Sequence, residues 1–509
     1  MDKDNLCDNE ATDYINKLNH RYTDMPGAFY TKVAVKPLTN SRWVIWNQDL
    51  AKQFNWPQSP PSGLFQRFLF GEQALEHHPA LAMKYAGHQF GSYNPDLGDG
   101  RGLLLGELKG HDGCLHDLHL KGAGITPYSR MGDGRAVLRS TIREYLCSEA
   151  LAGLGVPTTR ALGMFTSDTP VYREKSEFGA MLLRTTHSHI RFGHFEHFYY
   201  LQQTDQLRLL ADKVIEWYWP ECLDSDLPYL SMFIKIIDKT AALIAQWQGL
   251  GFTHGVMNTD NMSVLGETFD FGPFGFMDGY NSRFIPNHSD YQGRYAFDMQ
   301  PSIGLWNLSA LGQALTPLID KQHIEAELSH YQTKINHYYS EIIRSKLGLK
   351  SKQPEDAALF SDLFSLLEQQ RTDYTRFMRE LSCLDHQDGT NVTDLFLDRE
   401  AGLSWLTRYL ERCKLESDQC GTHQCGAHPR GAQITDKQRC EAMRKINPKY
   451  ILRNYLAEQA ITLAEQGDYS EIHRLAQLLK HPFDEQPELQ HYANLPPKWA
   501  KDIQISCSS

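Results

Sequence analysis

The pattern of apolar residues changes near residue 201, and this change restricts the folds open to the chain more than any other feature. Before that point, apolar residues alternate in short segments between turn residues, as in the stretch through Leu118, Leu120 and Lys121. Such alternation is typical of β-strands. Beyond Leu201, apolar residues recur at helical spacing, most clearly over residues 233–247. We therefore expect an α+β protein with a strand-containing N-lobe and a helical C-lobe.

The length of the chain indicates more than one lobe or domain. At 509 residues it exceeds what a single hydrophobic core usually holds. We expect a flanking region (1–95), the strand-containing lobe (96–200), the helical lobe (201–345) and a helical C-terminal extension (346–509). Amphipathic patterns predict helices in that extension at residues 359–381, 450–465 and 469–479.

Charge and composition limit the partners. The formal net charge is −11, whereas a nucleic-acid backbone or an anionic membrane surface favours a basic partner. The longest apolar stretches are too short to span a bilayer, and the first residues lack the pattern of a secretory signal. The ten cysteines show no repeated pairing pattern. We expect a cytoplasmic protein with no nucleic acid or membrane as partner.

Residues 98–102 (GDGRG) form a candidate phosphate-binding loop. Gly98 and Gly100 let the backbone approach a phosphate chain closely, and Arg101 adds a cation. A plain turn is the commoner explanation for such a loop.

Lys121 and Glu144 form a candidate ion pair beside that loop. Lys121 ends an alternating segment, and Glu144 lies in a helix expected over residues 135–151, with Asp133 as its cap. In protein kinases, a strand lysine pairs with a helix glutamate that holds it on the phosphates. A surface lysine and an exposed glutamate are the alternative.

Two further elements follow the 233–247 segment in the order found in kinases. Residues 254–261 (HGVMNTDN) span the eight positions of the kinase catalytic loop H-R-D-x-x-x-x-N, and His254 and Asn261 match it. Nine residues later, Asp270 begins a D-F-G triplet. These elements predict a metal site at Asn261 and Asp270, against the alternative of a capping asparagine and a turn aspartate.

One position departs from the kinase pattern. Val256 stands where kinases place the aspartate that positions the substrate hydroxyl, and a valine accepts no proton. Asp260 is the only other carboxylate in the loop and is the candidate base. A complete metal site without the usual base indicates that the protein uses the same nucleoside triphosphate as kinases but catalyses a different reaction on it.

Several long runs closely resemble the selenoprotein O family (SelO/YdiU). The similarity extends over nearly the whole chain, and the C-terminal CSS (507–509) also matches. The runs are HLKGAG (119–124), TPYSR (126–130), DGRAVLRSTIRE (133–144), IRFGHFE (190–196) and HGVMNTDNM (254–262).

This resemblance implies a pseudokinase fold that binds ATP in a flipped orientation, with Mg²⁺ or Mn²⁺ as cofactor. It implies transfer of AMP to Ser, Thr or Tyr hydroxyls of proteins, and UMP transfer is also attributed to bacterial members. Asp260 would be the base, and Asn261 and Asp270 the metal ligands. The nucleotide would contact Gly98, Gly100, Arg101, Lys121 held by Glu144, Asp133, Gly134, Arg184, Arg191 and Asp270.

Two cysteine-containing regions carry further expectations. The family is thought to form a regulatory disulfide to its C-terminal cysteine, but Pro286 stands where we expect the partner of Cys507. Residues 420–428 contain two cysteines and two histidines, at a spacing that fits zinc poorly. We expect a loop insertion at 420–428 and no disulfide between Cys507 and the segment around Pro286.

Two other functions stay open from sequence alone. A conventional phosphotransferase would keep an aspartate at position 256. A non-catalytic nucleotide-binding scaffold would have no need for Lys121, Glu144, Asn261 and Asp270 together.

Overall fold

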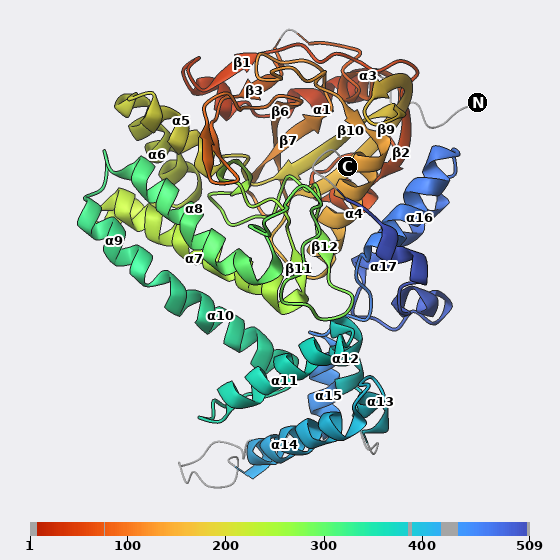
Figure 1. Ribbon diagram of the computed structural model, residues 1–509. Coiled ribbons are helices and arrows are strands. Elements are labelled where there is room, and N and C mark those ends of the chain that lie inside the picture. The colour runs from red at the N-terminus through yellow and green to blue at the C-terminus, as the bar shows by residue number, and fades with distance from the viewer. Residues whose placement is uncertain (1–7, 76, 385–388, 419–435, 506–509) are drawn as a thin grey trace, which may run out of the picture.

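The computed structural model describes residues 8–75, 77–384, 389–418 and 436–505. A large antiparallel sheet in the first part of the chain is followed by an array of helices (Figure 1). The expected α+β class is therefore confirmed. Within the described residues, no helix is both long and apolar enough to cross a membrane.

The main sheet has eight strands. Seven lie in the order β1-β3-β6-β7-β10-β9-β2 with antiparallel neighbours, and β8 pairs with β10. Three of them, β1 to β3, come from the first 95 residues, so the region expected to flank the lobe adds strands to its sheet. The boundaries at 95, 200 and 345 stay a prediction. The strands are β1 Tyr30–Lys32, β2 Arg42–Trp46, β3 Leu81–Met83, β6 Gly102–Lys109, β7 Leu115–Lys121, β8 Ala136–Val137, β9 Arg160–Tyr172 and β10 Ser176–Thr186.

Both faces of the sheet are buried, which explains the apolar run at the start of β6. Leu103 and Leu105 belong to a cluster shared with α1, α2 and α3, whereas Leu104 belongs to the cluster that contains α4. Successive side chains of a strand point to opposite faces, so a strand covered on both sides has to be apolar throughout. The covering helices are α1 Asp8–Asn16, α2 Gln48–Gln53, α3 Gly63–Leu69 and α4 Leu138–Gly153.

Helix α4 begins three residues later than predicted. Residues 136 and 137 pair with β10 as β8, so the backbone is still extended where the helix was expected. Asp133 does not cap the helix. Its carboxylate binds Arg173 at 2.8 Å, and the residue preceding the helix is Val137.

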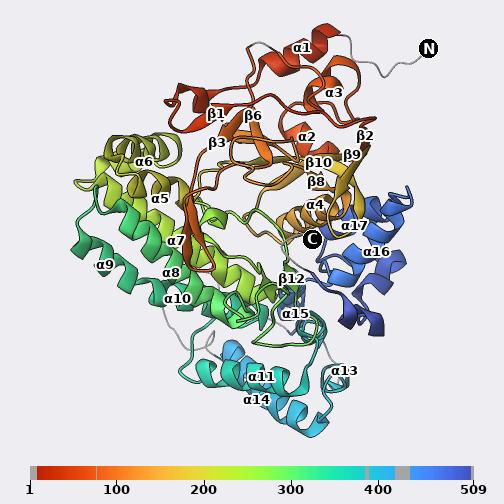
Figure 2. The same ribbon diagram turned by 45° about the horizontal axis from the view of Figure 1, so that its top comes forward.

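The face of α4 away from the sheet is covered by the last two helices, α16 (Asn454–Glu465) and α17 (Ser470–Lys480), as Figures 1 and 2 show. The approach is close, because a Cβ atom at Gly153 would lie 2.2 Å from the backbone oxygen of Leu479. Residues from all three helices share one hydrophobic cluster.

The helical part is built around α7 (Pro228–Leu250), whose apolar stripe is buried. The helix passes through Gly249 and stops at Gly251, which is in the left-handed conformation (φ 67°). Gly249 allows close packing, because a Cβ atom there would lie 2.5 Å from the side chain of Ile342 on α10. The neighbouring helices are α5 Phe192–Tyr200, α6 Thr204–Tyr218, α8 Gln300–Leu315, α9 Lys321–Ser329 and α10 Tyr331–Lys346.

A separate cluster of apolar residues holds the helices that follow α10. The single segment expected over residues 359–381 is two helices, because the chain turns at Arg371 (φ 52°). These helices are α11 Asp356–Gln370, α12 Tyr374–Leu381, α13 Thr390–Thr393, α14 Arg399–Asp418 and α15 Asp436–Arg444.

Two small two-stranded sheets and several 3-10 turns connect these layers. Strands β4 Gly87–Gln89 and β5 Ser92–Asn94 form a hairpin, and β11 Phe252–Thr253 pairs with β12 Gly275–Phe276 across the segment that carries Asp260 and Asp270. The 3-10 turns are η1 Arg21–Asp24, η2 Pro220–Asp224, η3 Thr259–Asn261, η4 Phe297–Met299, η6 Pro487–Ala493 and η7 Lys498–Asp502.

Candidate active site

A cavity of about 790 Å³ is lined by strands β6, β7 and β10, the loop before β6, the loops after β7 and β10, and the segment 256–273. Of the residues predicted from sequence to bind the nucleotide, ligate the metal or act as base, all except Glu144 line it. Glu144 lies directly behind Lys121. The residues at the cavity wall are Gly98, Gly100, Arg101, Lys121, Asp133, Gly134, Arg184, Arg191, Asp260, Asn261 and Asp270.

Two glycines of the 98–102 loop, Gly98 and Gly100, are required by close packing against Tyr128. Gly98 has φ +117°, and a Cβ atom there would lie 2.7 Å from the Tyr128 ring. A Cβ atom at Gly100 would lie 2.8 Å from the backbone oxygen of Tyr128. Larger residues would push the two loops apart, so these glycines shape the rim of the cavity.

Lys121 and Glu144 form the expected ion pair, and both are buried. The second carboxylate oxygen of Glu144 accepts a hydrogen bond from Arg184 at 3.1 Å. Burial lowers the pKa of Lys121, and Glu144 opposes this effect while Arg101 adds to it. The alternative of a surface lysine with an exposed glutamate is therefore wrong.

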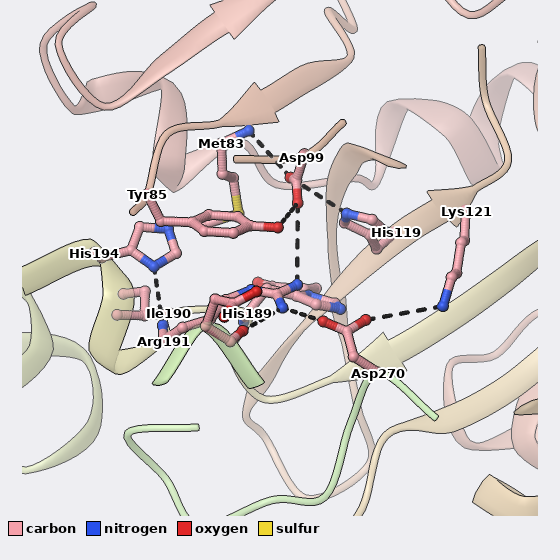
Figure 3. A network of polar contacts seen from close by, with 12 residues as sticks. Met83, Tyr85, Asp99, His119, Lys121, His189, Ile190, Arg191, His194 and Asp270 are labelled. Atoms are coloured by element: carbon pink, nitrogen blue, oxygen red, sulfur yellow. Dashed lines mark hydrogen bonds and ion pairs between the residues drawn. The ribbon is translucent and has the colours of Figure 1, made fainter. Parts of the chain in front are cut away.

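Asp270 is the point on which the cations converge (Figure 3). Its backbone is left-handed (φ 59°), and its carboxylate accepts hydrogen bonds from Arg184 at 2.7 Å and from Arg191. Lys121 lies 3.9 Å from the same carboxylate. Burial alone would raise the pKa of Asp270, but Arg191, Arg184 and Lys121 together hold it well below its ordinary value.

Arg191 is held in one position from several sides. Its guanidinium lies between the rings of Tyr85 and Phe269, 4.6 and 4.7 Å from their centres. It donates to the backbone oxygen of Asp260 at 2.7 Å and lies 4.0 Å from the Asp99 carboxylate. A guanidinium fixed in this way presents charge to the cavity without further ordering.

Asp99 is a site residue that the sequence pattern did not single out, because it was treated as part of a turn. It is buried, accepts a hydrogen bond from the Met83 amide at 3.1 Å, and faces His119 at 3.4 Å (Figure 3). Burial would raise its pKa, but His119, Arg191 and the Met83 amide hold the pKa at about 2. Asp99 therefore stays ionised and anchors Arg191.

Asp260, in η3, carries another carboxylate that lines the cavity. One of its oxygens accepts a hydrogen bond from Gln89 at 3.3 Å, whereas Oδ1 is buried without a hydrogen-bond partner among the described residues. Burial raises the pKa of Asp260 to about 7, although Arg191 acts in the opposite direction. A carboxyl group with a pKa near neutrality is suited to accept a proton.

The β4–β5 hairpin holds the loop that carries Asp260. The His88 amide donates to the Thr259 hydroxyl at 2.7 Å, and the Phe90 amide donates to the Asn258 side chain at 3.2 Å. No chemistry was assigned to this hairpin from sequence, because its partners lie some 170 residues further along the chain.

Replacing Gln89 with leucine is expected to raise the pKa of Asp260, because the lost hydrogen bond stabilises the ionised carboxylate. The acidic limb of the pH profile of kcat/KM should therefore move to higher pH, and the rate at high pH should recover. An unchanged acidic limb would show that Asp260 does not set this limb. Gln73, an exposed glutamine that does not line the cavity, provides the matched control as Gln73→Leu.

Asn261 and His254, the two residues that match the kinase catalytic loop, each form a hydrogen bond to a backbone oxygen. The side-chain amide of Asn261 donates to the Val256 backbone oxygen at 3.0 Å, which leaves its amide oxygen as the atom able to ligate a cation. His254 is buried and bonds the Phe269 backbone oxygen at 3.1 Å, so it joins the catalytic-loop segment to the segment before Asp270.

Further expectations from the sequence concern Asp133, the segment around Pro286, and the cysteines at position 507 and within residues 420–428. Asp133 lies at the mouth of the cavity, bound to Arg173. Pro286 packs beside Gly255, where a Cβ atom would lie 3.2 Å from its ring. Cys507 and residues 420–428 lie outside the described residues, so the expectations for them stay predictions.

The fold and this cavity define a class of protein: an α+β enzyme whose cleft gathers guanidinium, ammonium and carboxylate groups suited to a metal-bound polyphosphate. The chain belongs to the SelO family, because residues 14–480 match the family described as protein adenylyltransferase SelO. The resemblance found from sequence is thereby confirmed.

Curated relatives cover almost the full chain. The protein nucleotidyltransferase YdiU of Vibrio parahaemolyticus serotype O3:K6 is 59% identical over 490 residues, which is 96% of this chain and 98% of the relative. Proteins with the same name from Vibrio cholerae serotype O1 and Aliivibrio fischeri strain MJ11 are 58% and 60% identical. The Vibrio cholerae alignment covers 97% of this chain and 98% of the relative, and the Aliivibrio fischeri alignment covers 96% and 98%.

Proposed function

We propose that this enzyme transfers AMP from ATP to Ser, Thr or Tyr hydroxyls of proteins, with Mg²⁺ or Mn²⁺ as cofactor. Membership of a family of protein adenylyltransferases gives the reaction class, a nucleotidyltransferase that acts on proteins. The choice of the α-phosphate as the site of attack rests on one observation: Val256 stands where kinases have an aspartate, and Asp260 supplies a carboxylate elsewhere in the same loop. Both line the cavity. Val256 has no group that accepts a proton, whereas Asp260 has a buried carboxylate oxygen without a hydrogen-bond partner among the described residues.

The cations of the cavity are suited to the triphosphate. Lys121, Arg184 and Arg191 converge on one carboxylate, Asp270, and Arg101 stands at the rim. Guanidinium groups bind phosphate oxygens with two parallel donors, and buried cations act more strongly than exposed ones. Gly98, Gly100 and Gly134 allow the loops that line the cavity to pack closely against Tyr128 and Gly124, and Asp133 also lines the cavity.

Asn261 and Asp270 are the residues that would hold the metal. They offer an amide oxygen and a carboxylate, the oxygen donors that Mg²⁺ and Mn²⁺ prefer. Asp260 Oδ1, buried without a partner among the described residues, is consistent with a ligand at this place. The metal would supply charge neutralisation at the phosphates.

In the proposed reaction, Asp260 accepts the proton of the acceptor hydroxyl. The hydroxyl oxygen forms a bond to the α-phosphorus, the bond from that phosphorus to the bridging oxygen breaks, and pyrophosphate leaves with its electrons. Lys121, Arg184 and Arg191 offset the charge that grows on the leaving group. Because the hydroxyl attacks the α-phosphorus, the reaction needs no carboxylate at position 256 to position that hydroxyl, and a valine is tolerated there.

The architecture is consistent with a two-lobed, kinase-like fold in which the nucleotide binds in a flipped orientation. An antiparallel sheet carries Lys121, a helix packed on that sheet carries Glu144, and the loop at 254–261 follows the long helix α7. We propose that UTP can replace ATP as donor, and that the enzyme works in the cytoplasm on proteins, not on nucleic acids.

Label on the α-phosphate of ATP should become attached to protein, and label on the γ-phosphate should not. The enzyme is incubated with a proteome extract and, separately, alone, with Mg²⁺ or Mn²⁺. Modified acceptors should gain the mass of one AMP, and an arm with α-labelled UTP tests the second donor. Transfer of the γ-label would show a conventional phosphotransferase, and absence of both labels would favour a scaffold.

A further inference from the structure

Outside the cavity, three side chains with metal-binding atoms converge at one end of strands β7 and β10. Asp112 lies in the turn between β6 and β7, His116 lies on β7, and His187 directly follows β10. The two strands are neighbours in the sheet (Figure 1). One donor atom from each of the three residues lies within 4.8 Å of the other two.

The donor spacing is close to that of a zinc site. The Oδ2 atom of Asp112 lies 3.0 Å from His116 Nε2 and 3.7 Å from His187 Nε2. A tetrahedral zinc ion with bonds of about 2 Å separates its ligand atoms by roughly 3.3 Å, which falls between these two distances. Imidazole nitrogen and carboxylate oxygen are common zinc ligands.

The histidine rings are oriented by groups behind them. His187 Nδ1 bonds a Glu267 oxygen at 2.6 Å, and the other Glu267 oxygen accepts a bond from the Thr186 hydroxyl. A carboxylate on the second ring nitrogen is the usual support for a zinc-bound histidine, because it fixes the ring and leaves Nε2 for the metal. The His116 ring packs edge-on against Phe54, with ring centres 5.3 Å apart.

Gly110 leaves the space that this cluster occupies. A Cβ atom at Gly110 would lie 2.5 Å from Asp112 Oδ1 and 3.0 Å from His116 Nε2. A larger residue would therefore crowd the Asp112 carboxylate and the His116 ring.

We propose that Asp112, His116 and His187 bind a divalent transition-metal ion, with zinc the best fit. The side chains of Asp112 and His187 are 46% and 42% exposed, so the ion can enter from solvent and retain water at its open position. None of the three residues lines the nucleotide cavity. The ion would fasten the β6–β7 turn to the end of β10 and, through Glu267, to the segment that leads to Asp270.

The test is a zinc titration of the metal-stripped full-length chain by calorimetry, with the variants His116→Gln/His187→Gln and Asp112→Asn. Each variant should bind one zinc ion fewer than the parent or bind that ion at least tenfold more weakly. Glu267→Gln should weaken the same site about tenfold to a hundredfold, the typical effect of losing such a support. Zinc should also raise the melting temperature of the parent more than that of the variants.

The matched control is His111→Gln, because His111 is an exposed neighbour that bonds Asn55 and not the cluster. Its zinc stoichiometry should equal that of the parent. The parent and all variants are also prepared with Cys420→Ser and Cys425→Ser, so that zinc bound by those two thiols does not add to the stoichiometry of the proposed site. Equal zinc binding by the parent and by all cluster variants, or no zinc binding by the parent that carries these two substitutions, would overturn the proposal.

Discussion

Replacing Asp270 with alanine is expected to abolish nucleotidyl transfer and to lower the free energy of unfolding. Activity falls because the carboxylate is the proposed metal ligand. Stability falls because Arg184 and Arg191, both buried, lose a shared partner, and breaking a buried ion pair typically costs about 3 to 5 kcal/mol. The depressed pKa of Asp270 means that this contribution is present at neutral pH and is lost as the pH falls below about 4.

Asp356 offers a matched control for that experiment. Its buried carboxylate binds two guanidinium groups, those of Arg412 at 2.6 Å and Arg344 at 3.4 Å, far along the chain from the cavity residues. Asp356→Ala should lose comparable stability in denaturant titrations but retain activity per folded molecule. Near-parental turnover by folded Asp270→Ala with Mg²⁺ or Mn²⁺ would contradict the metal assignment.

Replacing Asp260 with asparagine is expected to lower kcat by about a hundredfold to ten-thousandfold, the usual effect of removing a general base. ATP affinity should change little, because the phosphates contact other residues. The protein should also become more stable at pH 8. Since the pKa of Asp260 is about 7 in the folded state and near 4 in the unfolded state, the parent loses stability as the pH rises from about 4 to about 7, by roughly 4 kcal/mol in total.

Two measurements distinguish the loss of a general base from a general disruption of the active site by the Asp260→Asn substitution. Calorimetry gives the ATP affinity, and denaturant titration at pH 5 and pH 8 gives the stability. The gain over the parent should be larger at pH 8, because the parent carboxyl is largely neutral at pH 5. A loss of ATP binding with unchanged turnover per bound complex would show that Asp260 is not the base.

The residues that could be found from sequence are those with a local pattern. Lys121 ends an alternating strand, Glu144 follows on an amphipathic helix, and Asn261 and Asp270 fall at fixed distances after the long helix. The α+β class followed from the same periodicities. Such patterns are readable because each depends on neighbours only a few residues away.

The residues that were missed depend on contacts between distant segments. Asp99 looked like part of a turn, and its role as the anchor of Arg191 requires β3, β7 and the segment after β10 to be in place. Gln89 lies in a hairpin too short to show a period, and it reaches Asp260 across 171 positions of sequence. Arg184 and Arg191 were identified only by resemblance, because nothing near them in sequence shows that both bind Asp270.

The packing of α16 and α17 on α4 has a consequence for biosynthesis. Helix α4 carries Glu144, and the helices that cover its outer face lie much later in the sequence, at residues 454–480. While those helices are still inside the ribosome, the apolar face of α4 has no cover, although every residue of the cavity has already emerged. Translation therefore delivers the catalytic residues long before it delivers the helices that pack on α4. The order of synthesis delays this packing until the residues of α17 have left the ribosome.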